Sequence, residues 1–168
     1  MSPALTLVVC GAPLASRSMD MEVALADRGW SVTTVVSPSA LRWRPAPPER
    51  ARTPRPDTVL ALPLTFNTAN KLVAGIMDTP TCGALCDALG TGTPLFAVTM
   101  VNDRLWGHPV WPSTLHTLTT AGVHWIDALG GSVERPAPVP SGTGDQLVGS
   151  FDAAAVAAAV PLPATVCE

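Results

Sequence analysis

Short runs of apolar and β-branched residues alternate along this chain with longer stretches that have helical spacing. The expected strands are Leu5–Cys10, Ser31–Val36, Thr58–Leu62, Leu95–Val98 and Val123–Ile126. The expected helices are Ala15–Arg28, Thr68–Ile76, Cys82–Leu89, Trp111–Ala121 and Phe151–Val160. Strands that alternate with helices in this way pair in parallel, with the helices covering both faces of the sheet. The pattern therefore predicts an α/β fold with a doubly wound, Rossmann-like parallel sheet and flavodoxin-like layers.

Length and composition narrow the class of protein. A chain of 168 residues is the size of one domain, and we expect a single domain over residues 1–168. Hydrophobic residues make up 47% and charged residues only 14%, which excludes a disordered chain. The net charge of −3 gives no electrostatic reason to expect a nucleic-acid partner. No apolar run approaches the roughly 20 residues of a membrane helix, so no membrane partner is expected.

The low charge also indicates an assembly of identical chains. Ordinary domains carry about 25% charged residues, so part of this surface is expected to be buried against other copies. The five tryptophans add apolar surface that a monomer would expose; they are Trp30, Trp43, Trp106, Trp111 and Trp125.

The amino-terminal residues and the cysteines indicate a cytoplasmic protein. Leu7-Val8-Val9-Cys10 resembles a lipoprotein cleavage site only weakly, because no basic segment precedes it and Val9 is not small. The four cysteines (Cys10, Cys82, Cys86 and Cys167) form no C-x-x-C pair. Cys82 and Cys86 would share a helix face, but two ligands do not make a zinc site. We expect buried thiols and no metal.

Two segments interrupt the alternation of strands and helices. Arg42–Pro56 combines five prolines with five of the ten basic residues, which excludes a helix or a central strand. It is either a solvated crossover linker or a flap that attracts an acidic substrate. Gly130–Gly149 is rich in Gly, Pro and Ser, and we expect a flexible connection there.

Candidate binding residues follow the expected strands. Ligands of an open parallel sheet bind outside the carboxyl ends of the strands. Small residues follow the first strand at Gly11, Ala12 and Pro13, where backbone N–H groups at a helix start can bind a phosphate. Hydroxyls, amides and a thioether follow the others, at Ser37, Ser39, Thr65, Asn67, Thr68, Met100 and Asn102. Hydroxyls and amides at these positions also serve as helix caps, so each alone has a purely structural explanation.

The order of these elements resembles a flavoprotein family, the homo-oligomeric flavin-containing cysteine decarboxylases. That family includes the phosphopantothenoylcysteine and the lantibiotic peptidyl-cysteine decarboxylases. Its PASANT motif is similar to Pro63-Leu64-Thr65-Phe66-Asn67-Thr68, and its K-x-x-x-G-I-x-D is matched by Lys71, Gly75, Ile76 and Asp78. Its P-S-A is matched by Pro38-Ser39-Ala40, and its P-x-M-N-x-x-M-W is partly matched by Thr99-Met100-Val101-Asn102-Asp103-Arg104-Leu105-Trp106. The resemblance runs from about Leu5 to Ile126.

By this resemblance the cofactor is FMN. Gly11, Ala12, Pro13 and Leu14 would surround its ribityl-phosphate chain, and Ser37 and Ser39 would bind the phosphate; Thr65, Thr68 and Met100 would lie near the ribityl group or the ring. Asn67 would hold the substrate carboxylate, and Asn102 belongs to the motif that recognises the substrate. The resemblance also implies a thiol-bearing small molecule or precursor peptide as substrate, and a homo-oligomer, either a trimer or a dodecamer.

One departure from the family concerns the base. The family's catalytic histidine precedes the PASANT motif by about ten residues, whereas Arg42–Pro56 contains no histidine. His108 follows the substrate-recognition motif and is the candidate replacement, with a surface or interface role as the alternative; His116 and His124 are weaker candidates. Three functions remain open: oxidative decarboxylation of a cysteine-type substrate, an FMN-dependent oxidoreductase or tailoring enzyme with altered chemistry, and a non-catalytic flavin-binding partner subunit.

Overall fold

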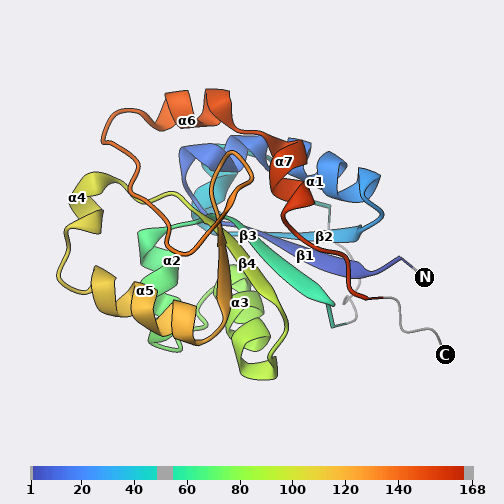
Figure 1. Cartoon of the computed structure of the whole chain (residues 1–168), viewed down its shortest axis with the longest axis horizontal. Coiled ribbons are helices and arrows are strands. Elements are labelled where there is room, and N and C mark those ends of the chain that lie inside the picture. The colour runs from blue at the N-terminus through green and yellow to red at the C-terminus, as the bar shows by residue number, and fades with distance from the viewer. Residues whose placement is uncertain (1, 49–54, 165–168) are drawn as a thin grey trace.

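The computed structural model describes residues 2–48 and 55–164, which form an α/β fold around one sheet (Figure 1). The strand order is β2-β1-β3-β4-β5-β6. The strands are β1 (Ala4–Val9), β2 (Ser31–Val36), β3 (Thr58–Leu64), β4 (Leu95–Thr99), β5 (Val123–Ile126) and β6 (Ser132–Val133). β1 to β5 pair in parallel and only β6 runs antiparallel, against β5. The predicted fold class is confirmed.

Helices cover both faces of the sheet. Figure 1 shows α1 (Ser18–Asp27), α6 (Gly144–Ser150) and α7 (Ala153–Ala158) on one face. On the other face lie α2 (Phe66–Val73), α3 (Pro80–Thr91) and α5 (Trp111–Thr120). Three shorter helices follow strand ends: the 3₁₀ helices η1 (Pro13–Arg17) and η2 (Pro38–Arg42), and α4 (Asp103–Trp106). No helix in the described parts of the chain is both long and apolar enough to cross a membrane.

The continuous apolar strands explain the two cores. Neighbouring side chains of a strand point to opposite faces, so a strand covered on both sides is apolar throughout. In β1, Leu5, Leu7 and Val9 pack into the core under α1 and α7, while Val8 packs into the core under α2, α3 and α5. The two cores hold the carboxyl ends of the strands in fixed positions.

The strands match the expectation more closely than the helices do. β2 and β5 have the expected bounds, and β3 continues two residues further than expected, through Pro63 to Leu64. The first expected helix, Ala15–Arg28, is divided into η1 and α1. Within the segment 130–149, expected to be a connection, the structure places β6 and the start of α6.

The tryptophans do not supply the exposed apolar surface that the sequence analysis expected. Trp30, Trp111 and Trp125 are buried, with 1–3% of their surface exposed. Trp43 and Trp106 are partly buried. Burying an indole removes a large apolar area from water, so the two cores take up these side chains in preference to the surface.

The Pro/Arg-rich segment Arg42–Pro56 does not expose all of its arginines to solvent, so the interpretation as a solvated or substrate-attracting charged loop is wrong for part of it. Arg44 has only 6% of its surface exposed, and its Nη1 lies 2.9 Å from Glu22 Oε1 and 3.1 Å from Ser18 Oγ, both on α1. Arg55 donates to the carbonyl of Thr91. Arg50 and Arg52 lie outside the described residues, so the interpretation as an acid-attracting flap remains untested for that part.

We expect Arg44→Ala to lower the free energy of unfolding by about 1.5–3 kcal/mol, because charged hydrogen bonds to Glu22 and Ser18 are lost. Urea unfolding followed by circular dichroism measures this change. Arg28→Ala, at an exposed position, is the matched control and should change stability by less than about 0.5 kcal/mol. Equal effects of the two substitutions would contradict a stabilising role for the buried guanidinium.

Candidate functional site

A cavity of about 1050 Å³ lies at the carboxyl ends of β1, β3 and β4, at the upper end of the range typical of small-molecule sites, about 300–1,000 Å³. Four groups of lining residues follow successive strands: Gly11–Pro13, Ser39 with Trp43, Thr65–Thr68, and Met100 with Asn102, Arg104 and Leu105. A fifth group, Val139–Gly142 with Gly144 and Asp145, comes from the segment after β6 and the first residues of α6. Because the parallel strands end at one edge, side chains far apart in sequence meet there.

Gly11 allows the chain to pass very close to η2. A Cβ at this position would lie 2.2 Å from Ser39 Oγ and 2.5 Å from Ser39 Cβ, distances that no side chain tolerates. The Ser39 hydroxyl lies 3.1 Å from that of Ser37. Glycine at this position therefore brings the backbone that opens η1 beside a serine hydroxyl, which makes a small polar cradle at one end of the cavity.

Thr65 and Asn102 act as helix caps as well as lining the cavity. Thr65 Oγ1 accepts from the Thr68 N–H at 3.4 Å, and Asn102 Oδ1 accepts from the Leu105 N–H at 2.9 Å. The structural explanation considered for these residues therefore applies to both. Because Oδ1 of Asn102 is used by the cap, its Nδ2 remains the group that can donate to a ligand.

Asn67 differs from these two residues. It lies in the first turn of α2, is exposed, and lines the cavity. Its side-chain amide has no hydrogen-bond partner among residues 2–48 and 55–164. An amide that does no structural work in the described chain is available for a ligand.

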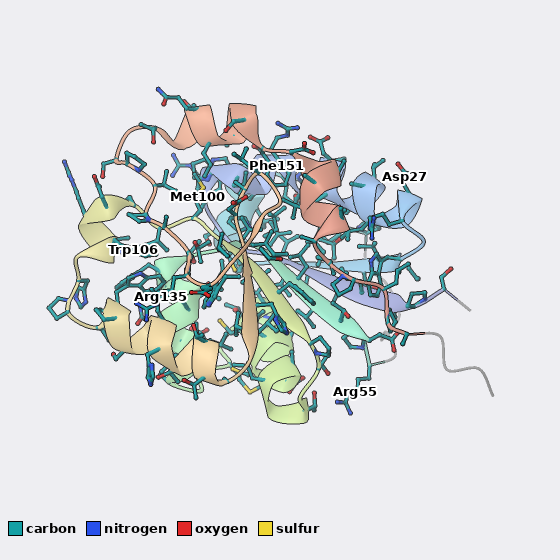
Figure 2. All side chains as sticks on the ribbon, in the orientation of Figure 1. Asp27, Arg55, Met100, Trp106, Arg135 and Phe151 are labelled. Carbon is teal, nitrogen blue, oxygen red and sulfur yellow. The ribbon has the colours of Figure 1, made fainter. Side chains whose placement is uncertain are left out.

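Met100 joins the end of β4 to the opening of η1. Its Sδ accepts from the Leu14 N–H at 3.3 Å, and Figure 2 labels it below α6. A Cβ on Gly144 would lie 3.3 Å from Met100 Cε, so the start of α6 also approaches this side chain. Met100 therefore lies where the end of β4, the opening of η1 and the start of α6 meet at the cavity.

Residues 134–143 are here called the crossing segment, and Val139–Gly142 of this segment form the remaining wall. The Val139 N–H donates to the Val101 carbonyl at 2.9 Å, and the Asp103 N–H donates to the Val139 carbonyl at 3.1 Å. The Ser141 hydroxyl donates to the Asp103 carboxylate and holds the pKa of Asp103 below its ordinary value. These bonds hold the crossing segment against the residues that follow β4.

Three predicted site residues do not line the cavity. Leu14 is fully buried in the core, and Ser37 is buried behind Ser39. His108 is exposed; its Nδ1 accepts from the Val110 N–H at 3.2 Å, and its ring contacts the Phe66 ring edge-on at 5.5 Å. Phe66 does line the cavity, so His108 lies one side chain away from it. The predicted roles of these residues remain predictions.

The remaining predicted residues do come together at the cavity: Gly11, Ala12, Pro13, Ser39, Thr65, Asn67, Thr68, Met100 and Asn102. The structure adds Trp43, Phe66, Arg104, Asp145 and the crossing segment, which the sequence analysis did not assign to the site. Phe66 and Arg104 lie inside the quoted motifs, so their position beside predicted site residues in the sequence could have indicated that they line the cavity. His124 stacks on Phe96 and His116 lies by another hollow, so no histidine of the described chain lines this cavity.

Cys10 lies beneath the cavity floor as an unreactive thiol. Burial raises its pKa to about 11, against the opposing hydrogen bonds of Thr68 and Thr65. The pKa of this thiol in the folded protein lies above the ordinary 9.0. The protonated thiol therefore stabilises the fold fully below pH 9, and the free energy of unfolding falls as the pH rises from 9 toward 11. Cys82 is also buried, Cys86 is partly exposed, and Cys167 lies outside the described residues.

We expect the Cys10 thiol to resist iodoacetamide at pH 8 in the native protein, since the thiolate is the nucleophile. Cys86, whose side chain is partly exposed, should be labelled faster. Peptide mass mapping after timed labelling measures both rates, with urea-denatured protein as the control in which all four cysteines react. Native labelling of Cys10 at the rate of Cys86 would contradict the buried position.

Comparison with known proteins identifies the family of this chain. The family described as Flavoprotein matches residues 43–144. The chain is 31% identical over 71 residues to the coenzyme A biosynthesis bifunctional protein CoaBC of Thermococcus kodakarensis, covering 42% of this chain and 17% of that protein. The chain thus spans less than a fifth of the length of this curated relative.

Solved structures share the fold at lower identity. The FMN-binding protein AtHal3 has a TM-score of 0.65 at 19% identity, covering 89% of this chain and 95% of that one. The FMN-dependent cysteine decarboxylase SpaF has a TM-score of 0.62 at 18% identity, covering 94% and 98%. A mutant PPC decarboxylase in complex with pantothenoylaminoethenethiol has a TM-score of 0.64 at 20% identity, covering 75% and 82%. Since the family match covers more than half of the residues, the chain belongs to the Flavoprotein family.

Proposed function

We propose that the protein is an FMN-dependent decarboxylase that acts on a thiol acid of the cysteine type, either a peptide with a carboxyl-terminal cysteine or a smaller molecule. The observation that carries this proposal is the free amide of Asn67 in the same cavity as the Gly11–Ser39 cradle. Family membership and the FMN-binding and decarboxylase neighbours support it.

The cavity residues fit FMN. The Gly11–Ser39 cradle offers a hydroxyl and close-packed backbone to the phosphate, at a place where Ser39 approaches Gly11 too closely for a Cβ. Thr65, Thr68 and Met100 line the cavity beyond it, where ribityl hydroxyls and a ring would lie. When bound, FMN would supply a hydride acceptor for oxidation of the substrate.

The chain's own residues have separate tasks in this proposal. Asn67 Nδ2 donates to the substrate carboxylate without neutralising it, so the carboxylate can still leave as carbon dioxide. Asn102 Nδ2, free of the cap, is a second donor on the same cavity. Val139–Gly142 of the crossing segment line one side of the cavity, and the Val139 backbone bonds to Val101 and Asp103 hold them there.

The proposed reaction also needs a base that takes a proton from the substrate. His108 is our candidate: the unprotonated nitrogen of its neutral ring is Nδ1, which accepts from the Val110 N–H at 3.2 Å and would have to release that bond before taking a proton. A second candidate function, an FMN-dependent oxidoreductase that keeps the carboxylate, is favoured by the lack of a histidine among the described lining residues.

The decisive experiment incubates FMN-loaded protein with a cysteine-terminated peptide and records its mass. Loss of one carbon dioxide and two hydrogens supports the decarboxylase. Loss of two hydrogens alone supports the oxidoreductase, and no change with FMN bound supports a non-catalytic partner subunit. A serine-terminated peptide is the control. Independently, FMN should raise the melting temperature, because it binds only the native state; a colourless protein with no shift would refute FMN binding.

We also propose that the protein is a homo-oligomer, a trimer or a dodecamer. Val73, Ile76 and Met77, at and after the end of α2, are 40–55% exposed large hydrophobic side chains. Such a group is typical of surface buried between subunits. Sedimentation should show an assembly at micromolar concentration, and a clean monomer would contradict it.

A further inference from the structure

We propose that Arg104 recognises a second anionic group of the substrate, separate from the carboxylate held by Asn67. This inference rests on the proposed function and narrows its substrate class to thiol acids that carry an additional carboxylate or phosphate.

Arg104 is the basic side chain of the cavity. It lies on α4, two residues after Asn102, and no other Lys, Arg or His of the described chain lines this cavity. The described lining residues bring one further charged group, Asp145. An anionic substrate therefore meets a single cation on these walls.

The Arg104 guanidinium is not held by a hydrogen-bonded partner, although its charge contributes to lowering the pKa of the neighbouring Asp103. The Arg104 side chain forms no ion pair or hydrogen bond within residues 2–48 and 55–164, although two carboxylates lie near. Asp103 is engaged by the Ser141 hydroxyl, and Asp145 is not within ion-pair distance. By contrast, Arg17, Arg44 and Arg55 each have a hydrogen-bonded partner.

The placement separates two recognition points. Asn67 comes from α2 and Arg104 from α4, so they line the cavity from two different helices. A neutral amide suits the carboxylate that must leave, whereas a cation beside it would stabilise the charge that the reaction removes. A guanidinium suits an anion that persists, since it pairs with carboxylate or phosphate through two parallel hydrogen bonds.

The test measures binding of non-reacting probes to the FMN-loaded full chain. Serine-terminated tetrapeptides, which lack the thiol, are compared in pairs: Ala-Glu-Ala-Ser with Ala-Gln-Ala-Ser, and Ala-phosphoserine-Ala-Ser with its unphosphorylated form. Calorimetry should show that the anionic member of at least one pair binds about fivefold more tightly, the upper end for an exposed ion pair. The pair that shows the preference identifies carboxylate or phosphate as the source of the charge. The preference should shrink at about 1 M salt, where charges are screened within roughly 3 Å.

Arg104→Gln should abolish the preference while FMN stays bound. Arg135→Gln is the matched control, because Arg135 lies on the crossing segment but does not line this cavity (Figure 2), and it should keep the preference. Equal binding within both pairs, or a preference that survives Arg104→Gln, would overturn the inference. If cysteine peptides are decarboxylated without charge preference, only this inference fails; if FMN does not bind, the proposed function fails with it.

Discussion

Gly11→Ala should yield a folded protein that has lost at least tenfold in FMN affinity. The new Cβ would meet Ser39 Oγ at 2.2 Å and the Ser39 backbone carbon at 2.8 Å, so η2 must move away from the opening of η1. That movement opens the cradle in which the phosphate is proposed to lie. Overpacking of this kind also costs about 1–3 kcal/mol of stability. Titration of the apoprotein with FMN, followed by flavin fluorescence, measures the affinity.

Gly90→Ala is the control for the Gly11 prediction. Gly90 lies in α3 with no atom within 4 Å of the added Cβ, and alanine favours a helix. This variant should bind FMN normally and be as stable as the parent or more stable by up to about 1 kcal/mol. Normal FMN affinity in Gly11→Ala would show that the phosphate does not use the Gly11–Ser39 cradle.

β1, β3 and β4 were predictable because burial on both faces imposes a largely apolar run, whereas the less buried edge strand β2 was recognised by its β-branched residues. β3 shows where this reasoning stops: Pro63 marks a break in sequence, yet the strand continues through it to Leu64. Proline lacks the N–H donor but keeps its carbonyl, and the Pro63 carbonyl accepts from the Cys10 N–H at 3.3 Å. The strand therefore continues past Pro63, with a shift in its register against β4 between Ala61 and Leu64.

The floor of the candidate site was predictable and its walls were not. Gly11, Ser39, Thr65 and Asn67 follow strands, and parallel strands end at one edge, so local order placed them together. The crossing segment is rich in proline, and this composition indicates its local backbone conformation but not which strands it crosses. It reaches the cavity through hydrogen bonds with Val101 and Asp103, and such contacts leave no periodic pattern.

Asn67→Ala should purify yellow and oligomeric yet turn over its substrate tenfold to more than a hundredfold more slowly. The amide has no structural partner in the described chain, so its loss leaves the fold and the FMN contacts of Gly11, Ser39 and Met100 in place. What is lost is a hydrogen bond to the charged carboxylate, worth about 1.5–3 kcal/mol. Flavin content, sedimentation and the rate of peptide mass loss measure the three parts of this prediction.

Two further variants separate the role of Asn67 from that of the base. Asn67→Asp keeps the shape but places a negative charge beside the substrate carboxylate, so it should be no more active than Asn67→Ala while retaining FMN. His108→Ala should lower the rate of peptide mass loss, because His108 is the proposed base. Because His108 contacts Phe66 and does not line the cavity, FMN content should not change. Full activity in both Asn67→Ala and His108→Ala would mean that carboxylate recognition and proton transfer use other residues, and the family mechanism would then not apply to this chain.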